Sequence, residues 1–500
     1  MKFSKISAVL FLAAAMAVAG CEVGPNFRQP KMAMPTHWSG TSADLGPTGS
    51  GPAANSAPSG HTTMVTSAPA NLATWWKSFQ DPVLNSLVGR ALAQNLSLQQ
   101  AQQQIVASRE VRNASAATLG PFVSAGGSYQ RSRGSKNLGS GGGGGPSESN
   151  LYQAGFDATW ELDIFGQVRR GVEAANANLK AAVDSRRELM VTLLGELGND
   201  YMTLRGIQRQ IVVTRDNLKS QIKTVALLKA QIGGGIATQL ALTSAQAQAQ
   251  TTRSQIPELR IQERQLIYAI SLLLSEPPDT LVKELSVKRP IPQVPSIVPV
   301  GLPGDLLLRR PDVRQAEQEY AAATANVGVA EANLFPQFTI NGNIGYSASD
   351  AAKWFDASSL GYGIGPSVSW SILNWGQVGA TINQQKALRV ESLLNYHQVV
   401  LQALSDADSA LAAYTRELVH EQDLTLAVKE NQQAVNLSLR LYHDGLTNYL
   451  NVLQAQQSLY LSQETLVQSQ TAVSADLVAL YKALGGGWPA AAAVKAKAKS

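Results

Sequence analysis

The sequence predicts an α+β protein with a two-fold internal repeat, in which each half contributes a β-hairpin and two long helices. Three observations support this prediction. Short motifs recur at a constant distance along the chain, and apolar residues alternate with polar ones in four stretches. In addition, two segments of about 66 residues contain no proline.

The N-terminus has the pattern of a secretory signal. Lys2 and Lys5 precede an apolar stretch that is shorter than the ~20 residues of a membrane-spanning helix, and small residues follow it. Val18-Ala19-Gly20-Cys21 is similar to a bacterial lipobox, so we predict a signal peptide over 1–20 and a covalent lipid on Cys21. An ordinary signal peptide with an incidental cysteine is the alternative. Glu22 after the cysteine, in place of aspartate, favours sorting to the outer membrane.

The charge gives no indication of a nucleic-acid partner. The formal charge of +5 falls to +3 when Lys2 and Lys5 leave with the signal peptide. Lys495, Lys497 and Lys499 lie in an Ala/Lys tail, so the body of the protein is nearly neutral. Beyond the signal no apolar run reaches ~20 residues, and any membrane crossing is therefore expected to use strands.

A stretch rich in Gly, Ser, Pro, Ala and Thr extends from Gly40 to Ala70. We interpret 21–70 as a lipid anchor followed by a flexible tether that leads to the folded body. The body begins at residue 71, and Asp81-Pro82 suits the start of a helix. The first repeat is predicted over 71–285, the second over 286–488, and a disordered tail over 489–500.

The internal repeat is recognised by a shared, ungapped register. Residues of the first half recur 210 positions later, as Trp160 does at Trp370. The matched pairs are Gly166 and Gly376, Gln167 and Gln377, Val168 and Val378, Gly235 and Gly445, Leu240 and Leu450, Ala245 and Ala455, and Gln246 and Gln456. Leu119 and Pro121 match Leu334 and Pro336 at a slightly different offset, which places a length change in a loop.

Four stretches alternate with period two and predict strands. They lie over Val123–Tyr129, Tyr152–Leu162, Phe338–Tyr346 and Tyr362–Ile372. Alternation over about ten residues with aromatic residues near the ends is typical of membrane β-barrel strands, although a soluble sandwich strand is the alternative for each one alone. Gly134–Asn150 and Ser347–Leu360 are predicted to be the hairpin loops. The run Gly141–Gly145 is not a phosphate-binding loop, because no Gly-Lys-Ser/Thr follows it.

Long helices are predicted between the hairpins. Gln167–Ile232 would span roughly 100 Å as one helix. A second helix is expected from Thr238 towards Leu274, interrupted or shifted at Pro257. The second half repeats this arrangement over Gln377–Tyr442 and Asn448–Leu484. Such helices are too long for a compact domain and predict a coiled-coil-like wall.

Four membrane strands cannot close a barrel, and lipid does not tolerate open sheet edges. Because known barrels have eight or more strands, the chain is expected to assemble with copies of itself, and the physics allows two, three or four. Strands that cross the outer membrane and helices that extend from it would form a tube for solutes.

The motifs also carry a family resemblance. Trp75-Trp76-Lys77-Ser78-Phe79-Gln80-Asp81-Pro82 and the segment Leu302–Val313, which reads Leu-Pro-Gly-Asp-Leu-Leu-Leu-Arg-Arg-Pro-Asp-Val, resemble the TolC-like outer-membrane efflux factors. The lipobox points to the lipoprotein (NodT-type) branch that serves resistance-nodulation-division (RND) pumps. Locally we interpret Leu302–Val313 as a connecting segment, with Asp312 capping a helix and Arg309 and Arg310 on its surface.

The resemblance implies a homotrimer with a twelve-stranded barrel and an α-helical periplasmic barrel. It implies a passive channel of a tripartite efflux pump for drugs or other small molecules, lipid-anchored in the outer membrane. The implied partners are a periplasmic adaptor, an inner-membrane RND transporter and outer-membrane lipid. The alternatives are the exit duct of a type I protein-secretion system and a coiled-coil envelope lipoprotein without a pore.

The same resemblance implies a periplasmic gate formed by Tyr442, Leu450 and Gln454. Gln454 occupies a position where the family has aspartate, which argues against a carboxylate ring there. Gly235 and Gly445, at the two helix turns, are the expected adaptor contacts, and glycine there also permits positive φ.

No enzymatic chemistry is indicated. The histidines His37, His61, His397, His420 and His443 show no metal-ligand spacing. No nucleophile elbow or Walker loop is present. We therefore predict no catalytic residue, no metal and no cofactor apart from the lipid.

Overall fold

The computed structural model describes residues 22–36, 38–39, 64–66, 72–134, 148–234 and 237–489. They fall into two compact units. Unit 1 takes in the N-terminal residues to 31, 103–183 and 315–397, and unit 2 takes in 32–102, 184–314 and the chain from 398 onward. The predicted signal peptide, Cys21, Gly235 and the tail from residue 490 lie outside the described residues.

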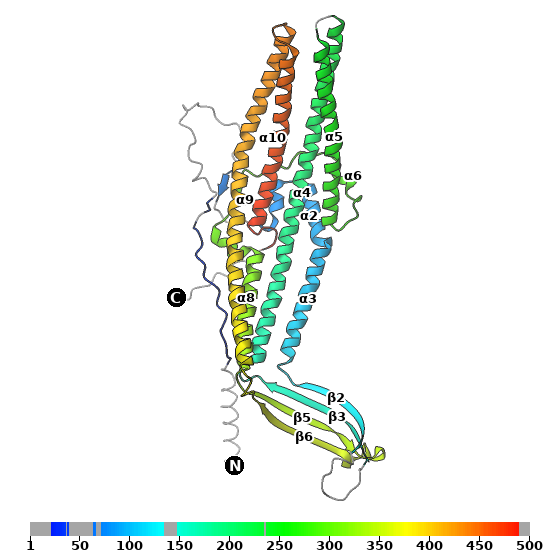
Figure 1. Cartoon of the computed structure of the whole chain (residues 1–500), viewed down its shortest axis with the longest axis vertical. Helices are drawn as coiled ribbons and strands as arrows, with labels where there is room; N and C mark the ends of the chain where they lie inside the picture. The colour runs from blue at the N-terminus through cyan, green and yellow to red at the C-terminus, as the bar shows by residue number, and fades with distance from the viewer. Residues whose placement is uncertain are drawn as a thin grey trace. The chain divides into compact units, whose positions relative to one another are not determined.

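Unit 1 contains a four-stranded antiparallel sheet with the order β2-β3-β5-β6 (Figure 1). Its strands are β2 (Phe122–Arg133), β3 (Glu148–Leu162), β5 (Gln337–Ala348) and β6 (Leu360–Ser369). The two hairpins predicted from the alternation are confirmed, and β3 pairs with β5 to join them. The strands β2 and β6 each have a single neighbour and form the two edges of the sheet.

Three predicted boundaries in the sheet were wrong. The first loop is shorter than Gly134–Asn150, because residues 148–150 pair with residues 131–133 of β2. Strand β6 ends at Ser369, because the chain turns there and the amide of Ile372 donates to the carbonyl of Trp370 at 3.1 Å. The second loop is also shorter than predicted, and it contains the short helices η4 (Ala351–Lys353) and η5 (Ala357–Ser359).

Glycines occupy one row across all four strands. Gly126 pairs with Gly155, Gly155 with Gly345, and Gly345 with Gly361. A Cβ at Gly155 would lie 2.6 Å from the carbonyl oxygen of Ile344, and the same holds for Gly345 against Ala154. Side chains are therefore excluded where β3 and β5 approach each other in this row.

The helices follow the repeat residue by residue. The helices α4 (Gln167–Gly233) and α9 (Gln377–His443) have 67 residues each, and α5 (Gln239–Leu273) and α10 (Tyr449–Ala483) have 35 each, with all bounds offset by 210. Before the loop that changes length, α3 (Leu96–Ala117) and α8 (Pro311–Ala332) are offset by 215, as are β2 and β5. The predicted duplication thus accounts for the order and length of these elements.

The predicted interruption of the helix at Pro257 was wrong, because α5 continues through this residue. Proline removes one helical hydrogen bond, but Pro257 is exposed, so the carbonyl it leaves unpaired can bind water. Thr252 and Leu259 on either side are buried. Packing of the flanking turns therefore outweighs the local cost of the proline.

In unit 2 short elements surround the long helices. These are η2 (Leu72–Phe79), α2 (Pro82–Gln94), α6 (Val282–Leu285), η3 (Pro303–Asp305), α7 (Leu306–Arg309), and the parallel strands β1 (Met64–Thr66) and β4 (Ile297–Pro299). The predicted helix start is confirmed, since the Asp81 carboxylate accepts from the amides of Val83 and Leu84. Trp75 stacks on Tyr481 at 5.4 Å and anchors the core of this region.

The residues between Cys21 and the Gly/Ser-rich stretch from Gly40 to Ala70 make specific contacts, and the tether over that stretch stays a prediction. In unit 1 the ring of Phe27 packs against Tyr320 at 5.7 Å. In unit 2 the Trp38 side chain is 5% exposed and donates to the carbonyl of Gly301 at 3.0 Å. Within the predicted tether, Met64–Thr66 forms β1.

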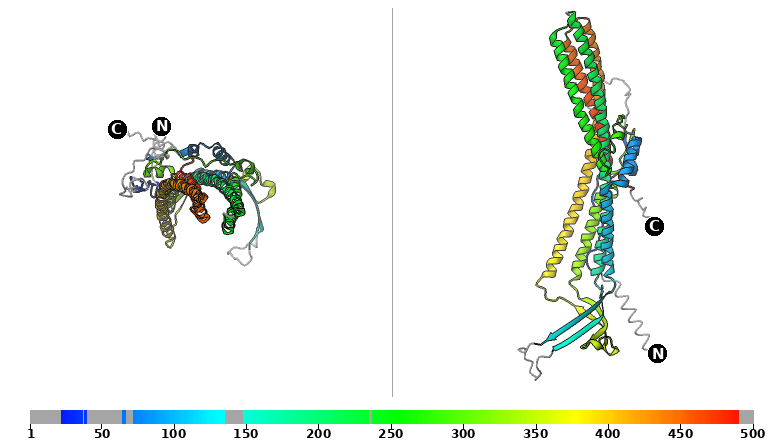
Figure 2. Two further views of the ribbon diagram at one scale, coloured as in Figure 1. Left: turned by 90° about the horizontal axis from the view of Figure 1, so that it is seen from above. Right: turned by 90° about the vertical axis from the view of Figure 1, so that its right-hand side faces the viewer.

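In unit 2 the α4–α5 and α9–α10 hairpins run side by side, as the two views of Figure 2 show. Each unit takes segments from both halves of the sequence, so the units cut across the repeats, whose boundaries stay a prediction. Among the helices that the structure describes, none combines the length and apolar character that a bilayer crossing demands.

Candidate functional site at the helix tips and the sheet faces

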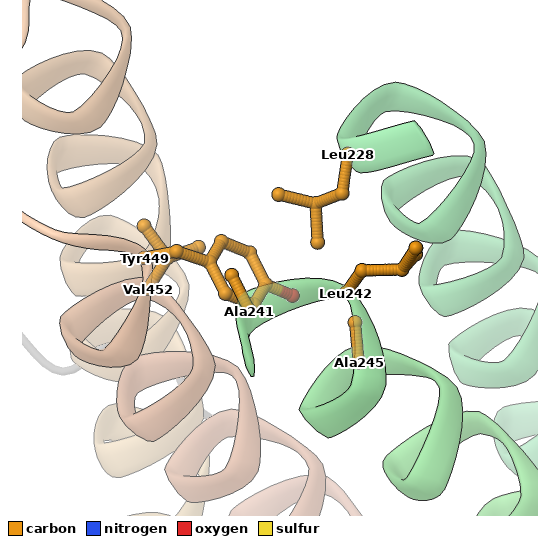
Figure 3. Packing of buried hydrophobic residues seen from close by; sticks show 6 residues of the cluster. All are labelled: Leu228, Ala241, Leu242, Ala245, Tyr449 and Val452. Carbon is orange, nitrogen blue, oxygen red and sulfur yellow. The ribbon is translucent and has the colours of Figure 1, made fainter. Parts of the chain in front are cut away.

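The ends of the two helical hairpins in unit 2 pack around a small apolar core, which we call the tip cluster (Figure 3). Its members come from α4, α5 and α10: Leu228, Ala241, Leu242, Ala245, Tyr449 and Val452. The Tyr449 ring extends from α10 towards Ala241, as Figure 3 shows. The cluster therefore holds the α4–α5 end against the α9–α10 end.

Tyr442, one of the predicted gate residues, lies at the edge of the tip cluster. Its hydroxyl donates to Oε1 of Gln231 on α4 at 2.9 Å, and its ring meets Tyr449 edge-on at 5.7 Å. Tyr442 thus links the two hairpins through its hydrogen bond to Gln231, and within its own hairpin it packs on Tyr449.

Tyr449 itself was missed by the sequence analysis. It is 5% exposed, and burial, together with the nearby Tyr460 and Tyr442, raises the pKa of Tyr449 to about 12. The helical spacing of apolar residues could have identified it, since Tyr449 and Val452 lie three apart in the sequence and so share one face of α10, which the structure buries. Gln231 carried no such signal, because its partner is 211 residues away.

The structure does not bring the three predicted gate residues together. Leu450 is 48% exposed and Gln454 is also exposed, one helical turn further along α10. Tyr442 lies instead at the tip cluster. The gate assignment stays a prediction, and of the three predicted gate residues Tyr442 alone contacts the other hairpin through a hydrogen bond within one chain, as far as the described residues show.

The turn between α9 and α10 is closed by Gly445, which adopts a φ of +72°. Its amide donates to the carbonyl of Tyr442 at 3.1 Å, and the amide of Leu446 donates to Leu441 at 2.9 Å. This left-handed end requires glycine for conformational reasons. Leu446 is 74% exposed, so the turn presents an apolar side chain next to the predicted adaptor contact.

The sheet of unit 1 has one apolar and one polar face. The register aligns the alternating residues of all four strands from the pair Tyr129 and Tyr152 to the pair Leu162 and Phe338. The one large apolar residue on the polar side of this part of the sheet is Phe122, which pairs with Thr159. The apolar face carries Val123, Ala125, Tyr129, Tyr152, Ala154, Phe156, Ala158, Trp160, Leu162, Phe338, Ile340, Ile344, Tyr346, Leu360, Tyr362, Ile364 and Val368. The polar face carries Ser124, Ser128, Gln153, Asp157, Thr159, Glu161, Thr339, Asn341, Asn343, Ser347 and Ser367.

The apolar face is open to its surroundings. Tyr362 is 83% exposed and Ile364 is 81% exposed, although both are large apolar side chains. Aromatic residues mark both ends of this face. Tyr129 and Tyr152 lie 4.8 Å apart at one end, and Trp160 at the other donates to the carbonyl of Leu119 at 2.9 Å. An apolar band with aromatic residues at its ends is the surface that membrane β-structures present to lipid.

With this geometry established, comparison with known proteins identifies the family. The family described as "Outer membrane efflux protein" matches residues 87–274 and 302–486. The chain belongs to this family.

Individual relatives support the same assignment for this outer membrane efflux protein. Nodulation protein T of Rhizobium leguminosarum bv. trifolii is 30% identical over 493 residues, which are 98% of each chain. The toluene efflux pump outer membrane protein TtgF of Pseudomonas putida is 28% identical over 486 residues, 96% of each chain. Among solved structures, the outer-membrane channel OprN gives a TM-score of 0.85 at 30% identity, with 94% of this chain and 100% of that chain covered.

The predicted resemblance to TolC-like efflux factors of the NodT type is therefore confirmed, as are the efflux function and the outer-membrane location with extension into the periplasm. The family is one of efflux channels and not of enzymes. Within the described part of the chain, no three His, Cys, Asp or Glu side chains cluster as metal ligands would.

In this outer membrane efflux protein the family motif over Leu302–Val313 includes a buried arginine, against our prediction of a surface one. Arg310 is 9% exposed and donates to Asp312 at 2.6 Å and to Asp406 at 3.2 Å. It also donates to the last carbonyl of α10, that of Ala483, at 3.1 Å. The motif thus places a cation at a helix C-terminus, where it is most favourable.

The same cap occurs in the first repeat of the efflux protein with a neutral residue. Asn95, 215 positions before Arg310, donates to the carbonyl of Leu273, the last residue of α5, at 2.8 Å. Asn95 also caps α3 by accepting from the amide of Leu98 at 2.9 Å. The duplication preserved the contact while the residue changed.

A second buried arginine of this efflux protein holds the residues that follow Cys21. Arg170 is 2% exposed and donates to the carbonyl of Val23 at 3.1 Å and to Oδ1 of Asn26 at 2.7 Å. Gly24 has a φ of +94°, and a Cβ there would lie 2.4 Å from Cα of Gly328. Residues 22–26, which we call the docking segment, are therefore fixed beside the junction of β3 and α4.

Proposed function

We propose that three copies of this chain form a passive duct for small molecules, with a twelve-stranded barrel in the outer membrane and a helical barrel in the periplasm. The observation that supports this most directly is the sheet with one exposed apolar face, one polar face and unpaired edges at β2 and β6. Four strands cannot close around a polar interior by themselves, and lipid does not tolerate open edges. Three copies would supply twelve strands, within the known range of barrels.

The exported compounds are drugs or other small organic molecules, and the energy comes from an inner-membrane RND transporter that a periplasmic adaptor joins to the duct. The names of the relatives support this class, since they include outer membrane proteins for toluene efflux and for pyoverdine export. The turn at Gly445 with the exposed Leu446, and its counterpart at Gly235, are the adaptor contacts in this proposal.

The helix tips act as the gate of the duct. In one chain, Tyr442 links the two hairpins through Gln231. The exposed Leu450 and Gln454 would meet their counterparts from the other copies and narrow the opening. Because Gln454 is an amide, this ring would carry no charge and would depend little on pH.

The lipid on Cys21 anchors the duct from the periplasmic side. The docking segment begins one residue after Cys21 and lies beside the end of β3, where the amide of Val23 donates to the carbonyl of Phe165 at 3.2 Å. The lipid would therefore enter the membrane next to the strands. No other cofactor is proposed.

The test is the single-channel conductance of the purified protein in planar bilayers, together with its oligomeric mass in detergent. A trimer with low resting conductance that rises in a Tyr442→Ala/Gln454→Ala variant is the expected result. Tyr460→Phe is the matched control, because Tyr460 also bonds across to α4, at Ser220, but further from the tips. A stable monomer without conductance in any variant would exclude the duct.

A further inference from the structure

We propose that neighbouring copies join by pairing β6 of one with β2 of the next, in the antiparallel register that sets Val368 opposite Gly127, and by seating Trp375 on Gly120. This inference rests on the proposed assembly of copies and specifies the surface that they share. It follows from the internal repeat, because the chain already contains one contact of this kind.

The template is the pairing of β3 with β5. Strand β3 closes the hairpin of the first repeat and β5 opens that of the second, so their contact joins two repeats. Strand β6 is the counterpart of β3 at an offset of 210, and β2 is the counterpart of β5 at an offset of 215. A repeat of the next copy placed against β6 would reproduce this contact.

The strand register within the hairpin is the same in both repeats. In the first hairpin Phe122 pairs with Thr159, and the two offsets carry this pair to Gln337 and Ser369, which pair in the second hairpin. Applied to β3 and β5, the same offsets carry the pair Ala158 and Gly342 to Val368 and Gly127. The register of the shared edge is fixed in this way.

This register also keeps the faces of the sheet continuous. Val368 and Gly127 both belong to the apolar alternation of their strands, so pairing them extends one apolar face from copy to copy. A shift by one residue would turn the apolar residues of one copy to the polar side. Val368 is 60% exposed, and its strand β6 forms one edge of the sheet, as Figure 1 shows.

The junctions below the strands supply a second, independent contact. Phe165, after β3, stacks on Phe335, before β5, at 4.6 Å and 19°. Their counterparts are Trp375 and Gly120. Trp375 is 93% exposed and adopts a φ of +49°, and a Cβ at Gly120 would meet only the carbonyl of Ala117 at 3.6 Å.

Among the described residues, an almost fully exposed ring therefore corresponds to a glycine with open space beside it. Where the chain pairs two phenylalanines internally, the predicted contact pairs a larger ring, tryptophan, with glycine, which has no side chain to obstruct it. The helices show a matching exchange. Arg170 packs on Gly328 within the chain, whereas the counterparts are Ala380 and Asn113, with the larger residue on the other side.

The experiment is disulfide cross-linking of the full-length protein in native outer membranes. The variant Gly127→Cys/Val368→Cys is expected to give oligomers on a non-reducing denaturing gel. Ala158→Cys/Gly342→Cys, which occupies the corresponding pair of β3 and β5 within one chain, calibrates disulfide formation and should remain at monomer mass. The single variants Gly127→Cys and Val368→Cys exclude cross-links through Cys21.

Two shifted pairs provide the control for register. Ala125→Cys/Val368→Cys and Tyr129→Cys/Val368→Cys stay on the same face but move one partner by two residues. Their Cα atoms would be about 7 to 8 Å apart, beyond the usual reach of a disulfide. Oligomers from a shifted pair with none from the matched pair would overturn the register.

The junction is tested by exchange of residues. Trp375→Phe or Gly120→Phe alone should lower the temperature at which the oligomer dissociates, and Gly120→Phe/Trp375→Phe should restore it by recreating the internal phenylalanine pair. If the double variant instead lowers the dissociation temperature by the sum of the two single decreases, Trp375 does not contact Gly120. A conducting trimer that cross-links at none of the three cysteine pairs contradicts this inference alone. A monomer without conductance contradicts the proposed function itself.

Discussion

Two arginines of this chain each hold distant segments together through buried hydrogen bonds, which the amino-acid composition does not indicate. Arg310 and Arg170 are both buried, and both donate to backbone carbonyls as well as to side chains. The sequence motif identified Arg310 as a family marker but placed it on the surface. Its burial depends on Asp406 and on the end of α10, which lie far away in the sequence.

We expect Arg310→Ala to lower the free energy of unfolding by about 2 to 3 kcal/mol, because it uncaps α10 and leaves Asp312 and Asp406 without their partner. The carboxylates are partly exposed, so water compensates some of the loss. The free energy of unfolding of Arg310→Lys should lie between those of the wild type and Arg310→Ala, since lysine keeps the positive charge but lacks the planar guanidinium that donates to several acceptors at once. Urea titration followed by helical circular dichroism measures this. The control is Arg309→Ala, and an equal loss in both variants would refute the special role of Arg310.

At the tip cluster, Tyr449 predicts a dependence on pH. Its pKa is about 12 in the folded chain against an ordinary value of 10.0, so folding favours the neutral phenol. The stabilisation that comes from the neutral phenol of Tyr449 is therefore fully present below pH 10. It decreases as the pH rises from 10 through 12, by about 3 kcal/mol in total.

The measurement is the distance between spin labels on the two hairpin ends as a function of pH. We expect the ends to separate above pH 10, and Tyr449→Phe to abolish the pH dependence of this separation. Tyr268→Phe serves as the control, because Tyr268 is exposed on α5 and lies outside the tip cluster. Separation at the same pH in Tyr449→Phe would assign the effect to another group.

At the scale of elements, most of the fold could be predicted because two periodicities and one repeat are visible in the sequence. Four strands and four long helices were found from alternation and from the absence of proline. The continuity of α5 through Pro257 and the burial of Tyr449 were not found, since both depend on packing between segments. The end of β6 was not found because the apolar alternation continues into the local turn that ends the strand. Of the predicted gate, only Tyr442 lies where two hairpins meet.

The docking segment is an element without regular structure, and its position depends on Arg170. We expect Arg170→Ala to increase hydrogen exchange in the peptide over residues 22–30, because three acceptors of this segment lose their donor. Gly24→Ala should act in the same way, since its φ is positive and its Cβ would collide with Gly328. The control is Arg169→Ala, whose side chain pairs with Asp163 instead. Unchanged exchange in Arg170→Ala would show that this arginine does not hold the segment.

At the scale of the whole molecule, the faces of the sheet decide which surface meets lipid. We expect Ile364→Lys to abolish assembly in the outer membrane, because a lysine at mid-depth on a lipid-facing strand costs about 2 to 4 kcal/mol in each copy. Gly365→Lys, one residue further on the polar face, should assemble, since nothing lies within 4 Å of a Cβ there. Cell fractionation and resistance of the oligomer to denaturation on gels measure both variants. Assembly of Ile364→Lys with failure of Gly365→Lys would reverse the faces.

The docking segment also changes how the anchor and the strands reach the membrane in time. A flexible tether of some fifty residues would let a lipid wander about 40 Å from the body. Here the first residues after Cys21 are seated beside β3, so the slack between anchor and body is nearly zero. Lipid and strands would therefore arrive at the same patch of bilayer, and the anchor would act as a guide for insertion as well as a means of retention.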